Sequence, residues 1–422
     1  MKRHLAVAGQ LVIAFLLLST FTGCLKDNCS HTYVLYTPVY KTLSEVRANI
    51  KSSAPKPLES TGKIYLYGNY IFLNEPDKGI HIIDNSKPAH PKNISFIPIP
   101  GNVDMAVKGN TLYADCYSDL VTLDISNPQQ VTAKGFLDNI FPHRNNFYVG
   151  NSSNPDSVKV VAEYLTRDTT VDCDTYKYLY NTFYVNALAD FNGNFAAPKS
   201  SGGAGIGGSM ARFTLVNDYL YAVTNNDLNV INVSTPQTPA FTGTKNIGWG
   251  IETIYPFKDK LFIGSTTGMF IYDVSDPASP TQTGQFSHVR SCDPVIADDN
   301  HAYVTLNSAA IFCQGTANQL DVLDINNLSN PKLLRTYSMA SPHGLSKDGN
   351  LLFICDGTAG LKIYNASNPL NHELVKNVHG METYDVIAWN KIALVVAREG
   401  LYQFDYSNPE DIRLVSKMEL KK

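Results

Sequence analysis

A short motif that recurs along the chain limits what the chain can fold into. In Gly268–Pro280, with the sequence GMFIYDVSDPASP, an apolar run ends at Asp273 and is followed by Ser and Pro. Six further variants carry an acid or amide at the same point, and the seven aligned residues are Asp84, Asp124, Asn232, Asp273, Asp324, Asn365 and Asp405. Most neighbouring copies are about 40 residues apart, and a period of this size predicts a repeat architecture.

Each repeat has the pattern of four short strands joined by tight turns. In residues 343–378, four strand-like runs are separated by Asp348-Gly349-Asn350, by a loop with two glycines and by a turn that contains Pro369. Gly and Asn tolerate the positive φ of tight turns, and Pro cannot continue a central strand. Four such strands form one antiparallel sheet, and sheets repeated radially become the blades of a β-propeller. The sequence therefore predicts an all-β fold, a β-propeller with seven four-stranded blades.

The seven aligned acids and amides are predicted to be structural turn residues. Asp, Asn and Ser side chains accept hydrogen bonds from nearby backbone N–H groups and hold tight turns. On seven different blades these side chains cannot converge on one metal ion or one substrate. No Cys/His cluster has the spacing of a zinc site. We therefore expect no metal and no cofactor.

One interval between motif copies is longer than the others. Roughly 110 residues separate Asp124 from Asn232, which is nearly 70 more than one period. The surplus falls in residues 142–209 and includes strand-like runs and a Gly-rich run at 200–209. An insertion between blades 2 and 3 is the favoured interpretation, because the strands expected before a stray turn copy at 151–155 are missing. A degenerate eighth blade is the alternative.

The N-terminal residues have the pattern of an export signal. A basic start, Met1–His4, precedes a mostly apolar stretch of about 14 residues, which is too short for a comfortable membrane span. A small residue followed by Cys24 resembles a bacterial lipobox and predicts removal of residues 1–23 and lipidation of Cys24. An ordinary secretory signal with an incidental Cys is the alternative. Residues 24–60 are expected to be an N-terminal linker with a short helix at 42–51, and residues 61–422 the propeller.

The repeats resemble those of the LVIVD-repeat lipoproteins, which are exported bacterial β-propeller proteins. Gly79–Asp84 (GIHIID) and Leu320–Ile325 (LDVLDI) carry the resemblance best, and it covers about residues 60–420. Asn232 and Asn365 replace the usual Asp, but Asn supports the same turn. The resemblance implies a propeller fold and a lipid anchor. It implies no activity, because a fold alone does not give a function.

Charge and cysteine content narrow the partners and the compartment. With 34 basic and 38 acidic residues, the chain lacks the basic excess of nucleic-acid-binding proteins, so no nucleic-acid partner is expected. Export makes disulfides possible. Cys292 and Cys313 lie in one repeat and are the candidate disulfide, with two free, buried thiols as the alternative.

The first strand of each blade lines the central channel of a propeller, so residues at the starts of these strands are candidate binding residues. They form a mixed ring of charged and polar side chains at the channel mouth: Lys63, Asp104, Arg212, Glu252, Asp293, His343, Tyr384 and Asp385. His343 with Asp293 or Glu252 could form an acid–base pair. The alternative is that these charges pair with one another and hold water. Trp249, between a fourth and a first strand, is expected to pack between blades, with an exposed platform for sugar or protein as the alternative.

The leading functional hypothesis is a non-catalytic lipoprotein of the cell envelope that binds a partner protein or an extracellular ligand. We expect binding on the face that carries the channel mouth and the insertion, because loops on a rigid scaffold are the usual place for it. The lipid would hold the protein at the outer membrane, on its periplasmic or its surface-exposed face. A hydrolase or lyase that uses the channel-mouth carboxylates and His343, or a purely structural envelope component, are the alternatives. No GxSxG, HExxH or Walker-A motif supports catalysis.

Overall fold

The computed structural model describes residues 30–149, 156–172, 205–291, 294–308, 315 and 317–421. The chain divides into two compact units. One comprises Met1–Thr37 and Tyr164–Asn192, and its described residues, 30–37 and 164–172, are parts of two long strands. The other, Pro38–Glu163 and Gly193–Lys422, carries the propeller.

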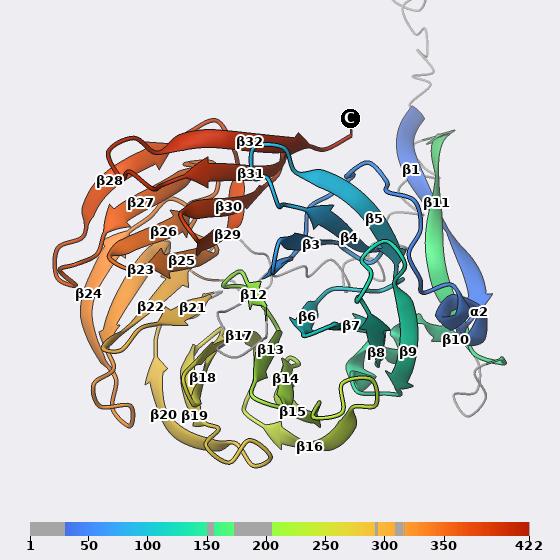
Figure 1. The fold of residues 1–422 in the computed structure, drawn as a ribbon, viewed down its shortest axis with the longest axis horizontal. Coiled ribbons are helices and arrows are strands. Elements are labelled where there is room, and N and C mark those ends of the chain that lie inside the picture. The colour runs from blue at the N-terminus through green and yellow to red at the C-terminus, as the bar shows by residue number, and fades with distance from the viewer. Residues whose placement is uncertain are drawn as a thin grey trace, which may run out of the picture. The chain divides into compact units, whose positions relative to one another are not determined.

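Seven consecutive four-stranded antiparallel sheets form a ring, which confirms the predicted propeller (Figure 1). The first two blades are β2 (Ile64–Tyr67), β3 (Tyr70–Glu75), β4 (Gly79–Asp84) and β5 (Lys92–Pro98), then β6 (Met105–Lys108), β7 (Thr111–Cys116), β8 (Asp119–Asp124) and β9 (Thr132–Leu137). The third and fourth are β13 (Phe213–Val216), β14 (Tyr219–Val223), β15 (Asp227–Asn232) and β16 (Ala240–Asn246), then β17 (Ile251–Phe257), β18 (Lys260–Ser265), β19 (Gly268–Asp273) and β20 (Thr281–Ser287). The fifth is β21 (Val295–Ala297), β22 (His301–Leu306), β23 (Gln319–Asp324) and β24 (Lys332–Ser338). The last two are β25 (Leu345–Asp348), β26 (Leu351–Cys355), β27 (Leu361–Asn365) and β28 (Glu373–Val378), then β29 (Thr383–Trp389), β30 (Ile392–Ala397), β31 (Gly400–Asp405) and β32 (Arg413–Glu419).

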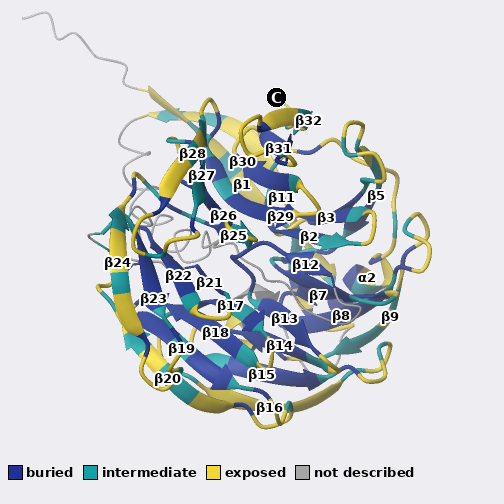
Figure 2. Ribbon diagram, turned by 60° about the vertical axis from the view of Figure 1, so that its left-hand side comes forward, coloured by how far each residue is buried: buried dark blue, intermediate teal, exposed yellow. Residues whose placement is uncertain are grey.

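The hydrophobic core lies between neighbouring blades. The inner three strands of each sheet are mostly buried, whereas the outermost strands, except β5, are mostly exposed or half-buried (Figure 2). Alternate side chains of one strand therefore pack against two different neighbours: Phe72 faces the second blade, and Ile71 faces the last. One cluster joins Ile64 and Ile71 of the first blade to Ile387 and Leu394 of the seventh, and this contact closes the ring. Burial on both faces explains why these strands read as continuous apolar runs.

The recurring acid or amide ends the third strand of every blade. Its Oδ1 accepts a hydrogen bond of 2.7–3.1 Å from the backbone N–H two residues later in all seven copies. The hydroxyl and N–H of Ser275 lower the pKa of Asp273 to about 2. The seven side chains lie on seven blades, so their predicted role in turns agrees with the structure.

The segment expected to be a linker is ordered structure from Ser30 onwards. It forms β1 (Ser30–Thr42) and α2 (Leu43–Ala48), and Thr42 and Glu45 form a capping box at the start of the helix. Leu43 and Val46 are buried in the propeller core, so the helix is held by packing. The apolar spacing of TLSEVRANIK predicts the helix.

The insertion between blades 2 and 3 is confirmed, since the ring has seven blades and not eight. Its described residues form a 3-10 helix η1 (Pro142–Phe147) and strands β10 (Tyr148–Val149), β11 (Lys159–Asp172) and β12 (Ile206–Gly207). Strands β1, β11 and β10 make a separate three-stranded sheet. Strand β12 instead pairs with β2, the innermost strand of the first blade, inside the ring (Figure 1).

Candidate functional site

The described candidate channel-mouth residues all lie at or near the starts of inner strands. Lys63, Asp104 and Arg212 immediately precede β2, β6 and β13, Glu252 is the second residue of β17, and His343 lies two residues before β25. Tyr384 and Asp385 are the second and third residues of β29. Asp293 lies outside the described residues.

Lys63 and Asp104 form a buried ion pair. The Lys63 ammonium lies 3.1 Å from Asp104 Oδ2, and both side chains are almost completely buried. Asp104 also accepts hydrogen bonds from the backbone N–H groups of Met105, Arg212 and Phe213. A carboxylate with this many donors fixes the starts of two inner strands and has little capacity left for a ligand.

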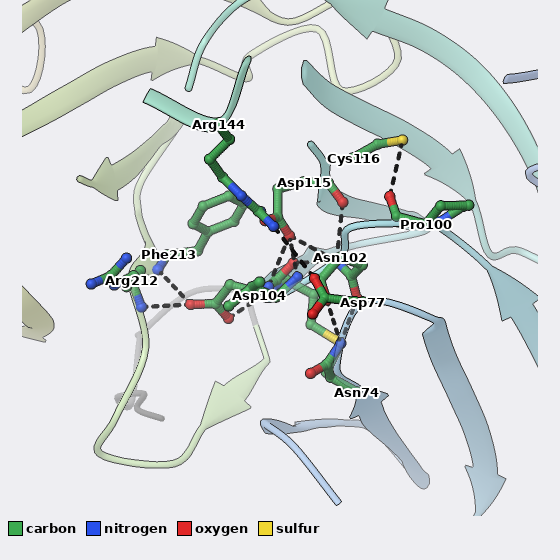
Figure 3. Close-up of polar contacts among 12 residues, drawn as sticks. Asn74, Asp77, Pro100, Asn102, Asp104, Asp115, Cys116, Arg144, Arg212 and Phe213 are labelled. Atoms are coloured by element: carbon green, nitrogen blue, oxygen red, sulfur yellow. Dashed lines mark hydrogen bonds and ion pairs between the residues drawn. The ribbon is translucent and has the colours of Figure 1, made fainter. Parts of the chain in front are cut away.

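A second network joins the mouth to the insertion (Figure 3). Asp115 Oδ1 accepts from the side chain of Asn102 and from the N–H groups of Val103 and Asp104. Asp115 Oδ2 pairs with Arg144 of η1. Asn102, Asp115 and Arg144 were not among the predicted site residues. Arg144 lies in the insertion, where the repeat period is broken and gives no guide to its position.

Residues 205–211 run through the centre of the ring. Gly205 N–H donates to Val107 O of β6, and Gly208 N–H donates to Ile64 O beside β2. The neighbouring Ser209 N–H donates to Asp385 Oδ1 of β29 at 3.2 Å, and Ser209 Oγ accepts from Leu345 N–H of β25 at 2.6 Å. The segment therefore joins the inner strands of four blades before Arg212 begins the third.

Glycines allow this segment to lie so close to the inner strands. A Cβ atom at Gly205 would overlap the ring of Tyr65 and Leu66 O, and a Cβ atom at Gly208 would overlap the Asp385 carboxylate. Gly205 and Gly208 of the Gly-rich run thus have a packing role. Part of the space inside the ring is therefore occupied by the chain itself.

Asp385 is buried with one carboxylate oxygen unsatisfied. Oδ1 accepts from Ser209 and Val386, whereas Oδ2 has no partner among the described residues. Burial raises the pKa of Asp385 to about 7, against its amide donors and the distant Lys63 charge. The side chain therefore exchanges a proton near neutral pH in a place that the chain's own backbone covers.

His343 is a neutral imidazole at the rim. Burial lowers the pKa of His343 to about 4. The ring lies 3.2 Å from Asn307 Nδ2 and makes an edge contact with Tyr384, with ring centroids 5.7 Å apart. The Tyr384 hydroxyl donates to Glu382, and burial with this neighbour raises the pKa of Tyr384 to about 12. An acid–base pair of His343 with Asp293 or Glu252 stays a prediction.

The Arg212 guanidinium is held loosely. Its Nε donates to Glu252 O and an Nη donates to Asn225 Oδ1, both at 3.4 Å. Among the described residues no carboxylate forms an ion pair with it. Arg212 is therefore the cation of this cluster with the most donor capacity left.

Trp249 contradicts the expectation that it packs between blades. It is 60% exposed, and the Arg290 guanidinium lies 5.1 Å from the ring centroid. Gly248 and Gly250 flank it with φ of 151° and 74°, a conformation that turns the side chain outward. Trp249 lies in the β16–β17 connection, while Arg290 and the exposed Val289 lie in the β20–β21 connection. These connections lead into inner strands, so the three residues, here called the Trp249 patch, lie on the channel-mouth face.

The other predicted residues lie outside the description or have no site chemistry. Cys24, Cys292 and Cys313 are not among the described residues. Cys116 and Cys355 are buried free thiols. In the described part of the chain no group of three or more His, Cys, Asp or Glu residues could hold a metal ion. No described helix is long and apolar enough to span a membrane.

Comparison with known proteins agrees with the repeats seen in the structure. The LVIVD repeat matches residues 60–95, 101–138, 207–246, 261–287 and 315–339. The chain contains LVIVD repeats. The last two blades lie beyond these five matches but end their third strands with the same turn, at Asn365 and Asp405. No curated protein matches the chain significantly.

Solved structures with the same fold are distant in sequence. The periplasmic gluconolactonase PpgL of Pseudomonas aeruginosa is 12% identical, with 87% of this chain and 97% of that chain covered and a TM-score of 0.53. A protein from Lactobacillus plantarum is also 12% identical, with 78% and 87% covered and a TM-score of 0.51. The computationally designed Ika8 protein is 8% identical, with 87% and 91% covered and a TM-score of 0.51. At these identities the comparison shows that this chain has the same fold as those proteins, and it shows no shared function.

Proposed function

We propose that this LVIVD-repeat propeller is a non-catalytic binding scaffold of the cell envelope, which a lipid on Cys24 anchors to the outer membrane and which holds a partner protein on the channel-mouth face. One observation carries the proposal: residues 205–211 lie inside the ring, hydrogen-bonded to its inner strands, and Ser209 of this segment binds the candidate carboxylate of Asp385. Asp104 and Asp385, two of the candidate carboxylates, are engaged by backbone N–H groups of the chain itself. A role at the surface of this face is then better supported than one inside the channel.

The Trp249 patch supports a protein partner. Trp and Arg are enriched among the residues that dominate protein–protein binding energy, and here they are in contact and exposed. Val289 adds exposed apolar area beside them. A stacked Arg and Trp are already ordered relative to each other, which lowers the entropic cost of binding.

Substitutions in the patch test the binding role. The full chain is recovered from native membranes after mild cross-linking, as wild type, Trp249→Ala, Arg290→Ala and Trp389→Ala. Trp389 is the matched control, because it is 48% exposed but lies at the end of β29, away from the channel mouth. We expect Trp249→Ala to reduce recovery of the partner at least tenfold while the melting temperature stays unchanged. Equal recovery from all four forms would contradict the proposed surface.

Surface substitutions are a sharper test than removal of the insertion. Val158 and Val160 are buried in the propeller core, and β12 pairs inside the ring. Deletion of residues 145–208 would remove these contacts, so a lost partner could reflect a damaged fold.

The anchor is tested separately. Replacing Cys24 with Ala removes the thiol that would carry the lipid, so the protein should move from the membrane to the soluble fraction. Membrane association that persists in salt and carbonate washes would contradict the anchor.

A hydrolase or lyase that uses the channel-mouth carboxylates and His343 is the alternative. Its support is that His343 is neutral at pH 7, as a general base must be, and that the fold is shared with a gluconolactonase. Hydrolysis of glucono-lactone that is lost in His343→Ala would favour this alternative over the scaffold. A purely structural envelope role would leave both the enzymatic and the cross-linking assays without a signal.

A further inference from the structure

The described residues of the smaller unit form a two-stranded ribbon with apolar side chains on both faces. Its described residues are 30–37 of β1 and 164–172 of β11. Thr32 and Thr170 share a side-chain hydrogen bond of 2.8 Å, and Tyr36 and Tyr164 make an edge contact with ring centroids 6.4 Å apart. Successive side chains of a strand point to opposite faces, so Val34 and Tyr36 share one face of β1 and their sequence neighbours the other.

This ribbon exposes more apolar surface than a ribbon in water tolerates. Val34, Tyr36, Tyr164 and Leu165 are all about half exposed or more. An isolated pair of strands is only marginally stable in water, and contiguous exposed apolar residues mark an interaction surface. The ribbon therefore needs a covering surface.

The charges of the ribbon argue against a strongly anionic covering surface. Its ionisable groups are His31, Arg167, Asp168 and Asp172, so acids outnumber the permanent cation. Such a ribbon has no basic cluster to attract anionic headgroups or nucleic acid. Attraction must come from aromatic and aliphatic contact, and Tyr suits a membrane interface because its ring is apolar and its hydroxyl polar.

The position of the ribbon in the sequence points to a bilayer. Ser30, the first residue of β1, follows Cys24 by six residues. Even a fully extended chain of that length spans at most about 22 Å. A lipid on Cys24 would therefore hold the start of β1 within that distance of the membrane. No partner protein would be needed to bring the ribbon to the membrane.

We propose that the β1–β11 ribbon is a second membrane contact, with Val34, Tyr36 and Tyr164 of one face seated at the boundary between headgroups and acyl chains. This inference rests on the proposed lipid anchor. The contact buries the exposed aromatic surface of the ribbon. Because it is apolar, it is insensitive to anionic lipid and to salt.

Lipid quenching of tryptophan fluorescence tests this contact in the lipidated full chain, reconstituted into phosphatidylcholine vesicles. Tyr36→Trp is made in a chain whose Trp249 and Trp389 are replaced by Phe. The control chain keeps Trp389 and replaces only Trp249, so that its single indole is also about half exposed but lies in the propeller. We expect lipids brominated near the headgroup to quench the introduced indole at least twofold more than the control indole, equally at 50 and 500 mM salt.

The outcomes separate the ribbon from the anchor. If mass spectrometry shows the lipid on Cys24 but the introduced indole is not quenched, the ribbon contact is overturned and the anchor stands. An unquenched indole that cross-links to a second copy of the chain would assign the ribbon to strand pairing instead. If no lipid is found on Cys24, the anchor and this inference fail together. Quenching that vanishes at high salt would also overturn an apolar contact.

Discussion

At the residue scale, Asp385 and Asp273 show opposite effects of environment on the same side chain. Asp385 is buried and its pKa is raised to about 7, whereas turn donors lower the pKa of Asp273 to about 2. The ordinary value for both is 3.8. Each shift is a statement about stability, and the two have opposite signs.

Asp385→Asn should change how stability depends on pH. The folded protein keeps a proton on Asp385 that the unfolded chain releases between about pH 4 and 7, so the wild-type free energy of unfolding falls as pH rises through this window. The slope for one group is at most about 1.4 kcal/mol per pH unit. Asn mimics the protonated form. The free energy of unfolding of the variant, measured by urea denaturation, should therefore rise relative to that of the wild type from pH 5 to pH 8. Parallel pH profiles for the two proteins would contradict the assigned pKa.

Asp273 should be replaceable by Asn but not by Ala. The Ser275 N–H lies 2.7 Å from Asp273 Oδ1, and Asn232 and Asn365 make the same bond in other blades. Losing one such bond costs about 1 kcal/mol, so Asp273→Ala should lower stability by that amount and Asp273→Asn by much less. The advantage of Asp over Ala is present above about pH 4 and is lost as pH falls through 2. Equal losses for Asn and Ala would show that the turn bond does not matter.

At the scale of the element, the strands and turns could be predicted from sequence and the central segment could not. Strand ends follow from local chemistry, as at Asp273, and periodicity then places Lys63 and Asp104 in register. The contact of Ser209 with Asp385 joins residues 176 apart, and nothing near either residue signals it. Trp249 was placed wrongly because its outward direction depends on two positive-φ glycines and not on its own polarity.

Gly208→Ala tests the packing of that central segment. The added methyl group would overlap the Asp385 carboxylate, and overpacking of a close-packed site typically costs 1–3 kcal/mol. Gly243→Ala in β16 is the matched control, because a Cβ atom there meets no atom within 4 Å. We expect a loss of about 2 kcal/mol for the first variant and a change below about 0.5 kcal/mol for the second, by thermal or urea denaturation. A neutral Gly208→Ala would mean that the segment is not pressed against β29.

At the scale of the whole propeller unit, two sets of contacts hold the ring of blades together. The first and last blades meet through an apolar cluster and a reciprocal amide pair between Asn85 and Gln403, without sharing a strand. Residues 205–211 add hydrogen bonds from the centre to β2, β6, β25 and β29, on both sides of this junction. The ring is thereby braced from inside.

Hydrogen exchange of the central segment tests this account most directly. The N–H groups of Gly205, Gly208 and Ser209 donate to Val107 O, Ile64 O and Asp385 inside the ring. Mass spectrometry of a peptide that covers residues 205–212 should therefore show protection within about tenfold of the β29 peptide, and far above that of the exposed turn at 85–91. Exchange of the 205–212 peptide as fast as that turn would show that this segment does not pack inside the ring, and the account of a propeller braced from its centre would be contradicted.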